Sequence, residues 1–317
     1  MTNKAEKIAT RVAYGHALKE FGGDERIIAL DADLGKSTMS ATFGEAYPER
    51  YFDMGIAEAN MAGVAAGLAS VGKIALIHSF AIFASGRIYD QIRNSIVYPG
   101  LNVKVVGSHA GVTVGQDGAT HQALEDIALM RALPGMTVLS PCDANETRLA
   151  VKAMIEHDGP CYMRTGRLPV PQITGDIPGY KFELGKGATL AEGRDVTIVA
   201  TGYMVAGALE AARLLGETGV SARVINIHTI KPLDEEIIIK AARETGALVT
   251  AEEHNIIGGL GSAVAEVLCE NCPVPLVRVG VKDVFGSSGD PEELVRHFGL
   301  AAGDIVEAAR RVITKKM

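Results

Sequence analysis

Residues 137–164, TVLSPCDANETRLAVKAMIEHDGPCYMR, contain a complete strand–helix–strand pattern. Two apolar runs of strand length, Thr137–Ser140 and Cys161–Arg164, enclose an amphipathic stretch, Asn145–Glu156, whose apolar side chains recur every three or four residues. Strands that alternate with helices in this way form βαβ units, in which the strands run parallel. This stretch therefore predicts an α/β fold built on a parallel sheet.

The same alternation continues along the rest of the chain. Further predicted strands are Ile27–Leu30, Ile74–His78, Val103–Val106, Val196–Ala200, Ala222–Ile227, Ala247–Thr250 and Leu276–Val279. Further predicted helices are Lys4–Phe21, Ala57–Ser70, Gln122–Leu133, Ala206–Gly216, Glu235–Glu244 and Ser262–Cys269. Between Leu168 and Gly187 the pattern stops at three prolines and several glycines. We therefore predict two parallel-sheet domains, residues 1–170 and 188–317, joined by a linker at 171–187.

Composition and charge exclude several classes of protein. The 317 residues carry 31 Lys and Arg against 38 Asp and Glu, and this net charge of −7 argues against nucleic acid as a partner. Four cysteines are too few for a disulfide framework, and the pair Cys269 and Cys272 lacks the further ligands of a zinc site. The most apolar stretch, Met61–Gly86, carries Lys73, His78 and four glycines, which indicates a buried helix and strand rather than a membrane span. We expect a cytoplasmic protein with reduced cysteines and no membrane contact.

Polar side chains cluster after the predicted strands of the first domain. In a parallel sheet, ligands bind beyond the carboxyl ends of the strands. The residues at these ends are Asp31, Asp33, Gly35, Ser37, Ser79, Phe80, Ser108, His109, Pro141, Asp143, Arg164 and Arg167. We therefore expect one ligand-binding crevice there. The comparable residues of the second domain, Thr201, His228, Glu252, Glu253 and His254, form a less coherent set.

Two stretches resemble nucleotide-binding motifs. GKST at residues 35–38 resembles the end of a P-loop, but Leu30 stands where that motif requires glycine. Its amides and hydroxyls remain suited to a sugar phosphate. GGLGSAV at residues 258–264 resembles part of a dinucleotide fingerprint, without a clear acidic partner for the ribose. Helix packing or a subunit contact is the favoured interpretation of this second stretch.

Three side chains each have a structural and a functional interpretation. Glu58 lies in the first turn of a predicted helix, where it either interacts with the helix dipole or offers a dry carboxylate to a heterocyclic nitrogen. Phe80 and Phe83 follow a predicted strand, where they either pack into the core or sandwich a flat ring. The residues alone leave both interpretations open.

A glycine-rich loop carries three further candidates. Residues 108–126, SHAGVTVGQDGATHQALED, have too little apolar content before the next helix to pack a core, which favours a functional loop. Its candidates are His109, Asp117 and His121. The histidine spacing fits no helical metal site, and the absence of a GxSxG motif disfavours an α/β-hydrolase.

With these residues in place, the chain resembles the C-terminal part of a transketolase, which comprises a pyrimidine-binding domain and a C-terminal domain. The resemblance runs from about Ala9 to the end of the chain. It is carried by the stretches DADLGKS, YFDMGIAEANMAG, SFAIFASGRIYDQIR, SHAGVTVGQDGATHQALED, YMRTGR, HTIKPLD and EEHNIIGGLGSAV. Each stretch alone is weak evidence, but all of them in the same order are specific.

The resemblance implies a cofactor, thiamine diphosphate, whose C2 carbanion adds to a ketose carbonyl. Glu58 matches the glutamate that hydrogen-bonds the aminopyrimidine ring and favours its imino tautomer, whose nitrogen removes the C2 proton. Phe80 and Phe83 match the aromatic pocket around that ring, and Asp33 matches an acid near the cofactor.

The resemblance also implies substrate contacts. His121 matches a histidine that contacts the C1 hydroxyl or carbonyl oxygen, and Asp117 matches a residue that reads the stereochemistry of a hydroxyl. The positions that match those gripping the sugar phosphate are Arg11, Ser37, His109 and Arg164. The implied activity is transfer of a two-carbon ketol unit from a ketose phosphate to an aldose phosphate, in the pentose phosphate pathway, with Glu58 and His121 as catalytic residues.

The chain departs from the family pattern in two respects. The third aromatic position of the pocket falls on Gly86, and the spacing of SFAIFASGRIYDQ suggests one extra residue, which leaves the matches of Gln91 and Arg93 open. The family's N-terminal domain, which binds the diphosphate and Mg²⁺ through a GDG motif, has no counterpart, since no GD in the sequence is followed by Gly. We therefore expect a natural subunit of a split transketolase. Its partner is an N-terminal subunit that carries GDG, and the chain pairs through its pyrimidine-binding domain.

Three alternatives remain at this point. Within thiamine enzymes, the chain is also similar to 1-deoxyxylulose-5-phosphate synthase and to the beta subunit of a 2-oxo acid dehydrogenase, although the latter usually has a different histidine loop. In another class, a non-catalytic scaffolding subunit retains the fold without the chemistry. The presence of Glu58, His109, Asp117, His121 and Arg164 speaks against it.

Overall fold

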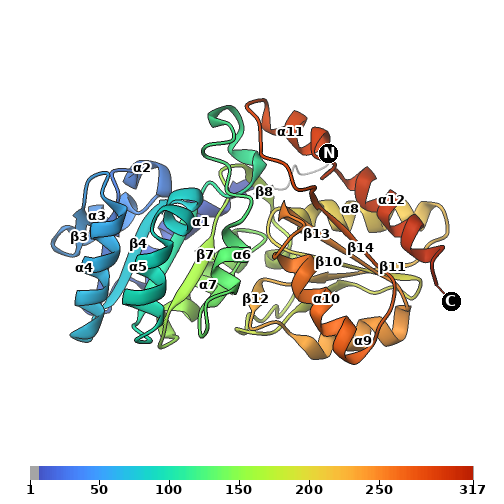
Figure 1. The fold of residues 1–317 in the computed structure, drawn as a ribbon, viewed down its shortest axis with the longest axis horizontal. Coiled ribbons are helices and arrows are strands. Elements are labelled where there is room, and N and C mark those ends of the chain that lie inside the picture. Colours follow the sequence, from blue (N-terminus) through green and yellow to red (C-terminus); the bar gives the residue numbers. More distant parts are fainter. Residues whose placement is uncertain (1–6, 317) are drawn as a thin grey trace.

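The computed structural model describes residues 7–316, which form two α/β lobes side by side (Figure 1). The first lobe contains a seven-stranded sheet in the order β12-β6-β7-β5-β4-β2-β3. Its strands are β2 (Ile27–Asp31), β3 (Tyr51–Asp53), β4 (Ile74–Phe80), β5 (Val103–Ser108), β6 (Thr137–Leu139), β7 (Cys161–Arg164) and β12 (Thr229–Lys231). All neighbours in this sheet are parallel except β12, which runs antiparallel to β6.

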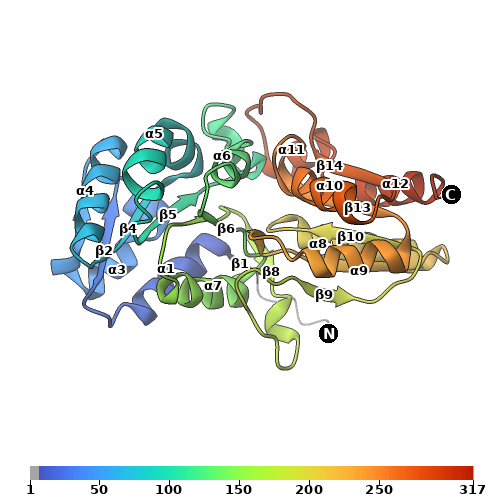
Figure 2. The same cartoon turned by 60° about the horizontal axis from the view of Figure 1, so that its bottom comes forward.

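Helices cover both faces of the first sheet, as Figure 2 shows. The helices of this lobe are α1 (Thr10–Phe21), α2 (Gly35–Thr38), α3 (Ala41–Ala46), α4 (Glu58–Ser70), α5 (Tyr89–Gln91), α6 (Asp126–Arg131) and α7 (Ala144–Glu156). Because successive strand residues point to opposite faces, Ile27 and Ala29 pack with α1 and α7, whereas Ile28 and Leu30 pack with α4. The strands are therefore buried on both sides, as parallel strands usually are.

The second lobe contains a five-stranded sheet in the order β14-β13-β10-β11-β9. Its strands are β9 (Ala188–Ala191), β10 (Val196–Ala200), β11 (Ala222–Asn226), β13 (Leu248–Asn255) and β14 (Leu276–Val281). Its helices are α8 (Met204–Glu217), α9 (Glu235–Thr245), α10 (Leu260–Asn271), α11 (Pro291–His297) and α12 (Ala302–Ile313). Only β9 is antiparallel to its neighbour. The predicted class, α/β with two parallel-sheet domains, is confirmed.

Among the predicted elements whose bounds differ in the structure, three bear on the candidate crevice. Strand β4 extends to Phe80, so Ser79 and Phe80 lie within the strand rather than after it. The predicted helix Gln122–Leu133 begins only at Asp126, because Ala123 pairs with Ala110 in a β-bridge and Glu125 has a non-helical φ of −128°. Of the predicted helix Lys4–Phe21, residues 4–6 lie outside the described part, and Lys7–Ala9 form β1, which pairs antiparallel with β8 (Pro169–Pro171).

One segment of the predicted second domain pairs with the sheet of the first lobe. Residues 229–231 were expected in the second domain, but they form β12 at the edge of the first sheet. Ile230 is buried there, and the Lys231 ammonium donates to the carbonyls of Arg131 and Leu133. A three-residue strand is too short to show a periodic pattern, so the sequence offers no sign that the chain returns to the first sheet.

Asp143 has a structural position rather than a place in the crevice. Its carboxylate caps α7 through the amide of Glu146 and accepts hydrogen bonds from the amides of Ile173 and Thr174 in the linker. The inclusion of Asp143 among the crevice residues was therefore wrong.

Three general features follow from the described residues. No helix within residues 7–316 is long and apolar enough to span a membrane. The four cysteines are free, as expected. In the same residues, no group of three or more His, Cys, Asp and Glu side chains is arranged to hold a metal ion.

Candidate active site

Glu58 is the first residue of α4, and its carboxylate is buried with 4% of the side chain exposed. The amides at the start of a helix favour a negative charge at this position. The Arg87 guanidinium donates to Glu58 Oε1 at 2.6 Å and lies over the ring of Phe83, 4.1 Å from its centroid. The carboxylate and the aromatic face therefore border the same space.

Two histidines of the glycine-rich loop meet the aromatic pair. Phe80 and Phe83 are nearly parallel, with ring centroids 6.2 Å apart. The ring of His121 lies edge-on to both, 5.3 Å from Phe83 and 6.2 Å from Phe80. His109 lies 4.1 Å from Phe80. The fold thus joins residues from α4, the end of β4 and the loop after β5 in one cluster.

The backbone is strained at two candidate residues, one in this cluster and one outside it. His109 has a φ of 57° and Asp33 a φ of 61°, in the left-handed region that residues with a Cβ seldom adopt. Such strain is concentrated at functional sites, where the surrounding structure holds it in place.

Two arginines, Arg11 and Arg167, lie on the His109 side of the cluster and form what we call its cationic end. Arg11 donates to the carbonyl of Ser37 at 2.7 Å. Burial, together with the positive charges of Arg11 and Arg167, lowers the pKa of His109 to about 3. His109 is therefore neutral at neutral pH. The Arg167 guanidinium also lies 3.4 Å from Asp117 Oδ2. The cationic end is therefore next to Asp117, the residue expected to contact a hydroxyl of the substrate.

Arg164 does not belong to this cationic end, and its assignment to the sugar phosphate was wrong. Its side chain is 6% exposed and forms an ion pair with Asp126, with Nε at 2.9 Å from Oδ2. Its remaining donors go to the carbonyls of Ala123 and Glu253. Burial opposes ionisation of the guanidinium, but Asp126 raises the pKa of Arg164 overall.

Arg167 was expected in the crevice, but the sequence reasoning did not include it among the residues that contact the sugar phosphate. It lies three positions after Arg164 in YMRTGR, and 39% of its side chain is exposed. It donates to the carbonyl of Val114 at 2.9 Å, in the loop that carries His109. The signal available in the sequence was a second arginine at the carboxyl end of the same strand.

The acidic residues after β2 have different roles. Asp31 is fully buried and accepts hydrogen bonds from the hydroxyls of Thr38 and Ser40 and from the amide of Leu34. The GKST stretch is therefore folded around a carboxylate, which is incompatible with a P-loop. Asp33 is exposed, and its backbone amide donates to Asp53. This hydrogen bond does not connect Asp33 to the aromatic cluster.

The second lobe holds the glycine-rich loop in place. Glu253 Oε1 accepts the amide of Thr113 at 2.7 Å, and Gln122 donates to the carbonyl of Ser287 at 2.9 Å. Figure 1 shows this loop beside α11, and a Cβ at Gly115 would lie 2.9 Å from Pro291. The polar residues of the second domain therefore serve the site of the first.

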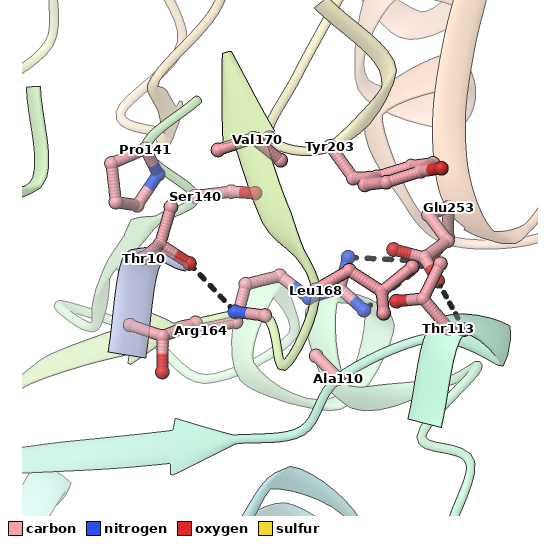
Figure 3. A pocket seen from close by; sticks show the side chains of 13 residues that line it. Thr10, Ala110, Thr113, Ser140, Pro141, Arg164, Leu168, Val170, Tyr203 and Glu253 are labelled. Atoms are coloured by element: carbon pink, nitrogen blue, oxygen red, sulfur yellow. Dashed lines mark hydrogen bonds between the residues drawn. The ribbon is translucent and has the colours of Figure 1, made fainter. Parts of the chain in front are cut away.

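A small cavity marks this contact between the lobes (Figure 3). It measures about 30 Å³, and the side chains around it include Thr10, Thr113, Arg164, Tyr203 and Glu253. Burial raises the pKa of Glu253 to about 7, against the opposing effects of Arg164 and the Thr113 amide. The volume is that of about one water molecule, so the cavity suits a bridging water rather than a substrate.

The GGLGSAV stretch is occupied by a side chain of the protein itself. Glu252 accepts the amides of Leu260 and Gly261 at the start of α10. A Cβ at Gly259 would lie 2.0 Å from Glu252 Oε2. This arrangement disfavours a dinucleotide site, because the amides that would bind a pyrophosphate already bind a carboxylate.

Comparison with known proteins agrees with this arrangement. Residues 6–172 match the family model "Transketolase, pyrimidine binding domain", and residues 185–305 match "Transketolase, C-terminal domain". The chain belongs to the transketolase family. The resemblance drawn from the sequence motifs is thereby confirmed, and the comparisons identify it as the C-terminal part of a transketolase.

The transketolase relatives fall into two size classes. A 6-deoxy-6-sulfo-D-fructose transketolase subunit from Clostridium sp. (strain MSTE9) is 51% identical over 314 residues, which cover 99% of this chain and 97% of the relative. A solved structure titled "Split gene transketolase, inactive beta4 tetramer" has a TM-score of 0.90 and 53% identity, with coverage of 98% and 100%. The transketolase of Homo sapiens is 37% identical over 315 residues, and the chain spans only 50% of its length.

Proposed function

We propose that this chain is the pyrimidine-side subunit of a thiamine-diphosphate-dependent transketolase, active only with a separate N-terminal subunit. The reaction is transfer of a two-carbon ketol unit from a ketose phosphate to an aldose phosphate. The observation that carries the proposal is the buried Glu58 carboxylate beside Phe83, connected through His121 and Phe80 to the cationic end at His109.

The residues present fit the aminopyrimidine half of the cofactor. Thiamine diphosphate supplies a carbon nucleophile for the substrate carbonyl when it is bound. Glu58 would hydrogen-bond a ring nitrogen and hold the proton that this nitrogen exchanges. Phe80 and Phe83 would orient the flat ring, because aromatic faces favour stacked or edge contacts. We assign the Mg²⁺-bound diphosphate to the partner subunit, since subunit-length relatives are named as subunits and full-length ones are about twice as long.

The other end of the site fits a sugar phosphate. Arg11 and Arg167 would offer charged donors to an anion, Ser37 a hydroxyl and neutral His109 a ring N–H. Arginine fits a tetrahedral oxyanion through two parallel hydrogen bonds. Between the two ends, His121 and Asp117 are placed to contact the hydroxyl and carbonyl oxygens of the sugar. Holding the substrate at both ends fixes its reacting carbon, which is how positioning lowers a barrier.

The decisive experiment isolates the chain with its partner. The tagged chain is purified from its own cells with thiamine diphosphate and Mg²⁺ and analysed by native mass spectrometry. Co-isolation of a second, GDG-bearing chain with bound cofactor supports the proposal. A homo-oligomer without partner or cofactor would contradict it.

Glu58→Ala in that complex is expected to lower ketol transfer at least about 100-fold, because the proton at the ring nitrogen loses its partner. Melting of the variant and association with the partner should remain close to wild type. The matched control is Glu156→Ala, which removes a carboxylate from an exposed ion pair on α7 and should leave activity unchanged. Full activity in Glu58→Ala would refute the role of Glu58.

The identity of the anionic sugar needs a separate assay. A relative with 51% identity is named for 6-deoxy-6-sulfo-D-fructose, and a sulfonate presents a tetrahedral oxyanion like that of a phosphate. The complex should therefore be tested with xylulose 5-phosphate, fructose 6-phosphate and 6-deoxy-6-sulfofructose as donors. Turnover of pyruvate without two-carbon transfer from any of them would favour a deoxyxylulose-phosphate synthase or oxo acid dehydrogenase instead. Bound partner without cofactor or turnover would favour a scaffolding subunit.

A further inference from the structure

Arg87 makes both of the contacts that the proposed function assigns to the aminopyrimidine ring. Its Nη1 lies 2.6 Å from Glu58 Oε1, within hydrogen-bond distance. Its guanidinium carbon lies 4.1 Å from the centroid of Phe83. One planar group thus bonds the carboxylate and covers the aromatic face at once.

The chemistry of the two groups is alike. A guanidinium is planar and delocalised, carries N–H donors in its plane and stacks on aromatic rings. An aminopyrimidine is also planar and donates in its plane while its faces meet aromatic rings. The same face of Phe83 cannot stack on both groups together, because the guanidinium already lies 4.1 Å from its centroid.

The position of Arg87 allows it to leave. Its side chain is 47% exposed, so the contact with Glu58 has the modest strength of a partly solvated ion pair. It ends the π-helical turn Phe83–Arg87, a winding that is frequent at functional sites and holds one more residue than an α-helical turn. A Cβ added at the preceding Gly86 would have no neighbour within 4 Å, so the space beside Arg87 is open.

We infer that Arg87 is an internal competitor of the cofactor, which occupies the Glu58–Phe83 subsite and must swing out before an aminopyrimidine binds. This inference rests on the proposed function for the identity of the ligand. It makes the affinity of the subunit for the cofactor lower than its recognition groups alone would give. A charged group of the partner or cofactor that draws Arg87 away would raise that affinity.

The test measures binding of an aminopyrimidine without a diphosphate. The full chain is titrated with 4-amino-5-hydroxymethyl-2-methylpyrimidine in a calorimeter. Arg87→Met keeps the length of the side chain but removes its charge and donors, and we expect it to bind the probe about 5- to 20-fold more tightly than wild type. Arg87→Lys keeps the charge without the planar guanidinium. Its affinity for the probe should lie between those of wild type and Arg87→Met.

Two controls identify the cause of a gain in affinity. Arg93→Met removes the same charge from the same segment, where Arg93 contacts Asn94 and not Glu58, and should leave affinity unchanged. In Glu58→Gln/Arg87→Met the gain should disappear. As a second readout, the probe should speed modification of Arg87 by 4-hydroxyphenylglyoxal in the wild-type chain, measured by peptide mass spectrometry.

Equal or weaker binding by Arg87→Met would overturn the inference, since weaker binding would mean that Arg87 contacts the ligand. Its failure can be told apart from failure of the proposed function. If the wild-type chain binds the probe through Glu58 and Arg87→Met changes nothing, only the competition is wrong. If no form binds the probe, the competition is also wrong, and the activity of Glu58→Ala in the two-chain complex decides whether the proposed function survives.

Discussion

Arg164 and Arg167 lie three residues apart but bind different partners. Arg164 is buried against Asp126, whereas Arg167 is part-exposed beside His109 and Asp117. A buried, paired guanidinium holds the protein together, and an exposed one next to a second arginine is available to an anion. Burial and partners, rather than residue type, therefore separate a structural arginine from a binding one.

Substitution of the two arginines should separate binding from stability. In the two-chain complex, Arg167→Met should raise KM for a phosphorylated donor by about 10- to 100-fold and leave kcat and melting nearly unchanged, because one charge-assisted contact is lost. Arg164→Met should instead destabilise the chain by about 3–5 kcal/mol, since Asp126 is left buried without its partner. Steady-state kinetics and urea unfolding measure the two effects. The reverse pattern would restore Arg164 to the phosphate site.

At the scale of the element, the glycine-rich loop is shaped by contacts from the second lobe. Gly111 has a φ of 82°, and a Cβ on it would lie 2.2 Å from the carboxyl carbon of Glu253. Two independent reasons therefore require glycine at this position: the left-handed backbone conformation and the close approach of the Glu253 carboxylate. The conformation of the loop is therefore set in part by a strand of the other lobe.

A pair of glycine substitutions separates these two requirements. Gly72 has a similar φ of 87°, but a Cβ there would meet nothing within 4 Å. Gly72→Ala should therefore cost only about 1 kcal/mol of unfolding free energy for the left-handed backbone. Gly111→Ala should cost about 2–4 kcal/mol, since Glu253 must also move. Urea unfolding measures both, and equal losses would show that the carboxylate makes no steric demand.

At the scale of the whole molecule, the two lobes are joined by buried polar contacts. Strand β12 completes the first sheet from within the second half of the chain, and Glu253 bonds the amide of Thr113 across the boundary. Burial raises the pKa of Glu253 to about 7, and it does the same for Glu146, which accepts a hydrogen bond from Asn226 of the second lobe. The contact between the lobes should therefore respond to pH.

The sign of that response follows from the raised pKa. Glu253 keeps its proton in the folded chain at pH values where the unfolded chain has released it, so its stabilising contribution is complete below about pH 4.5 and is lost as pH rises through 7. The difference between the pKa of Glu253 in the folded chain, about 7, and its ordinary value of 4.5 corresponds to about 3 kcal/mol of unfolding free energy. Glu253→Gln cannot titrate but keeps an oxygen for Thr113. Between pH 5 and 8, the unfolding free energy of Glu253→Gln should fall less than that of wild type. Glu146 titrates in both proteins, so its effect is the same in the two profiles. Parallel pH profiles in urea unfolding would contradict the role of Glu253.

The sequence by itself determined the fold class, because alternating strands and helices leave a periodic pattern that needs no long-range information. The family motifs likewise named the carboxylate, aromatic and histidine candidates, Glu58, Phe80, Phe83, His109 and His121, which the structure brings into one cluster. Phe80 and Phe83 lie at and just after the end of β4, and His109 and His121 lie in the loop after β5, where the topology of a parallel sheet makes them converge. Glu58 joins them from the start of α4.

Only the tertiary structure decided which partner each polar group has. It paired Arg164 with Asp126, left Arg167 beside His109, placed β12 in the first sheet and set Arg87 against Glu58. Each of these contacts joins residues far apart in the chain, so no local pattern encodes it. The choice depends on which side chains are buried together, because a charge removed from water must find a partner or lose its charge.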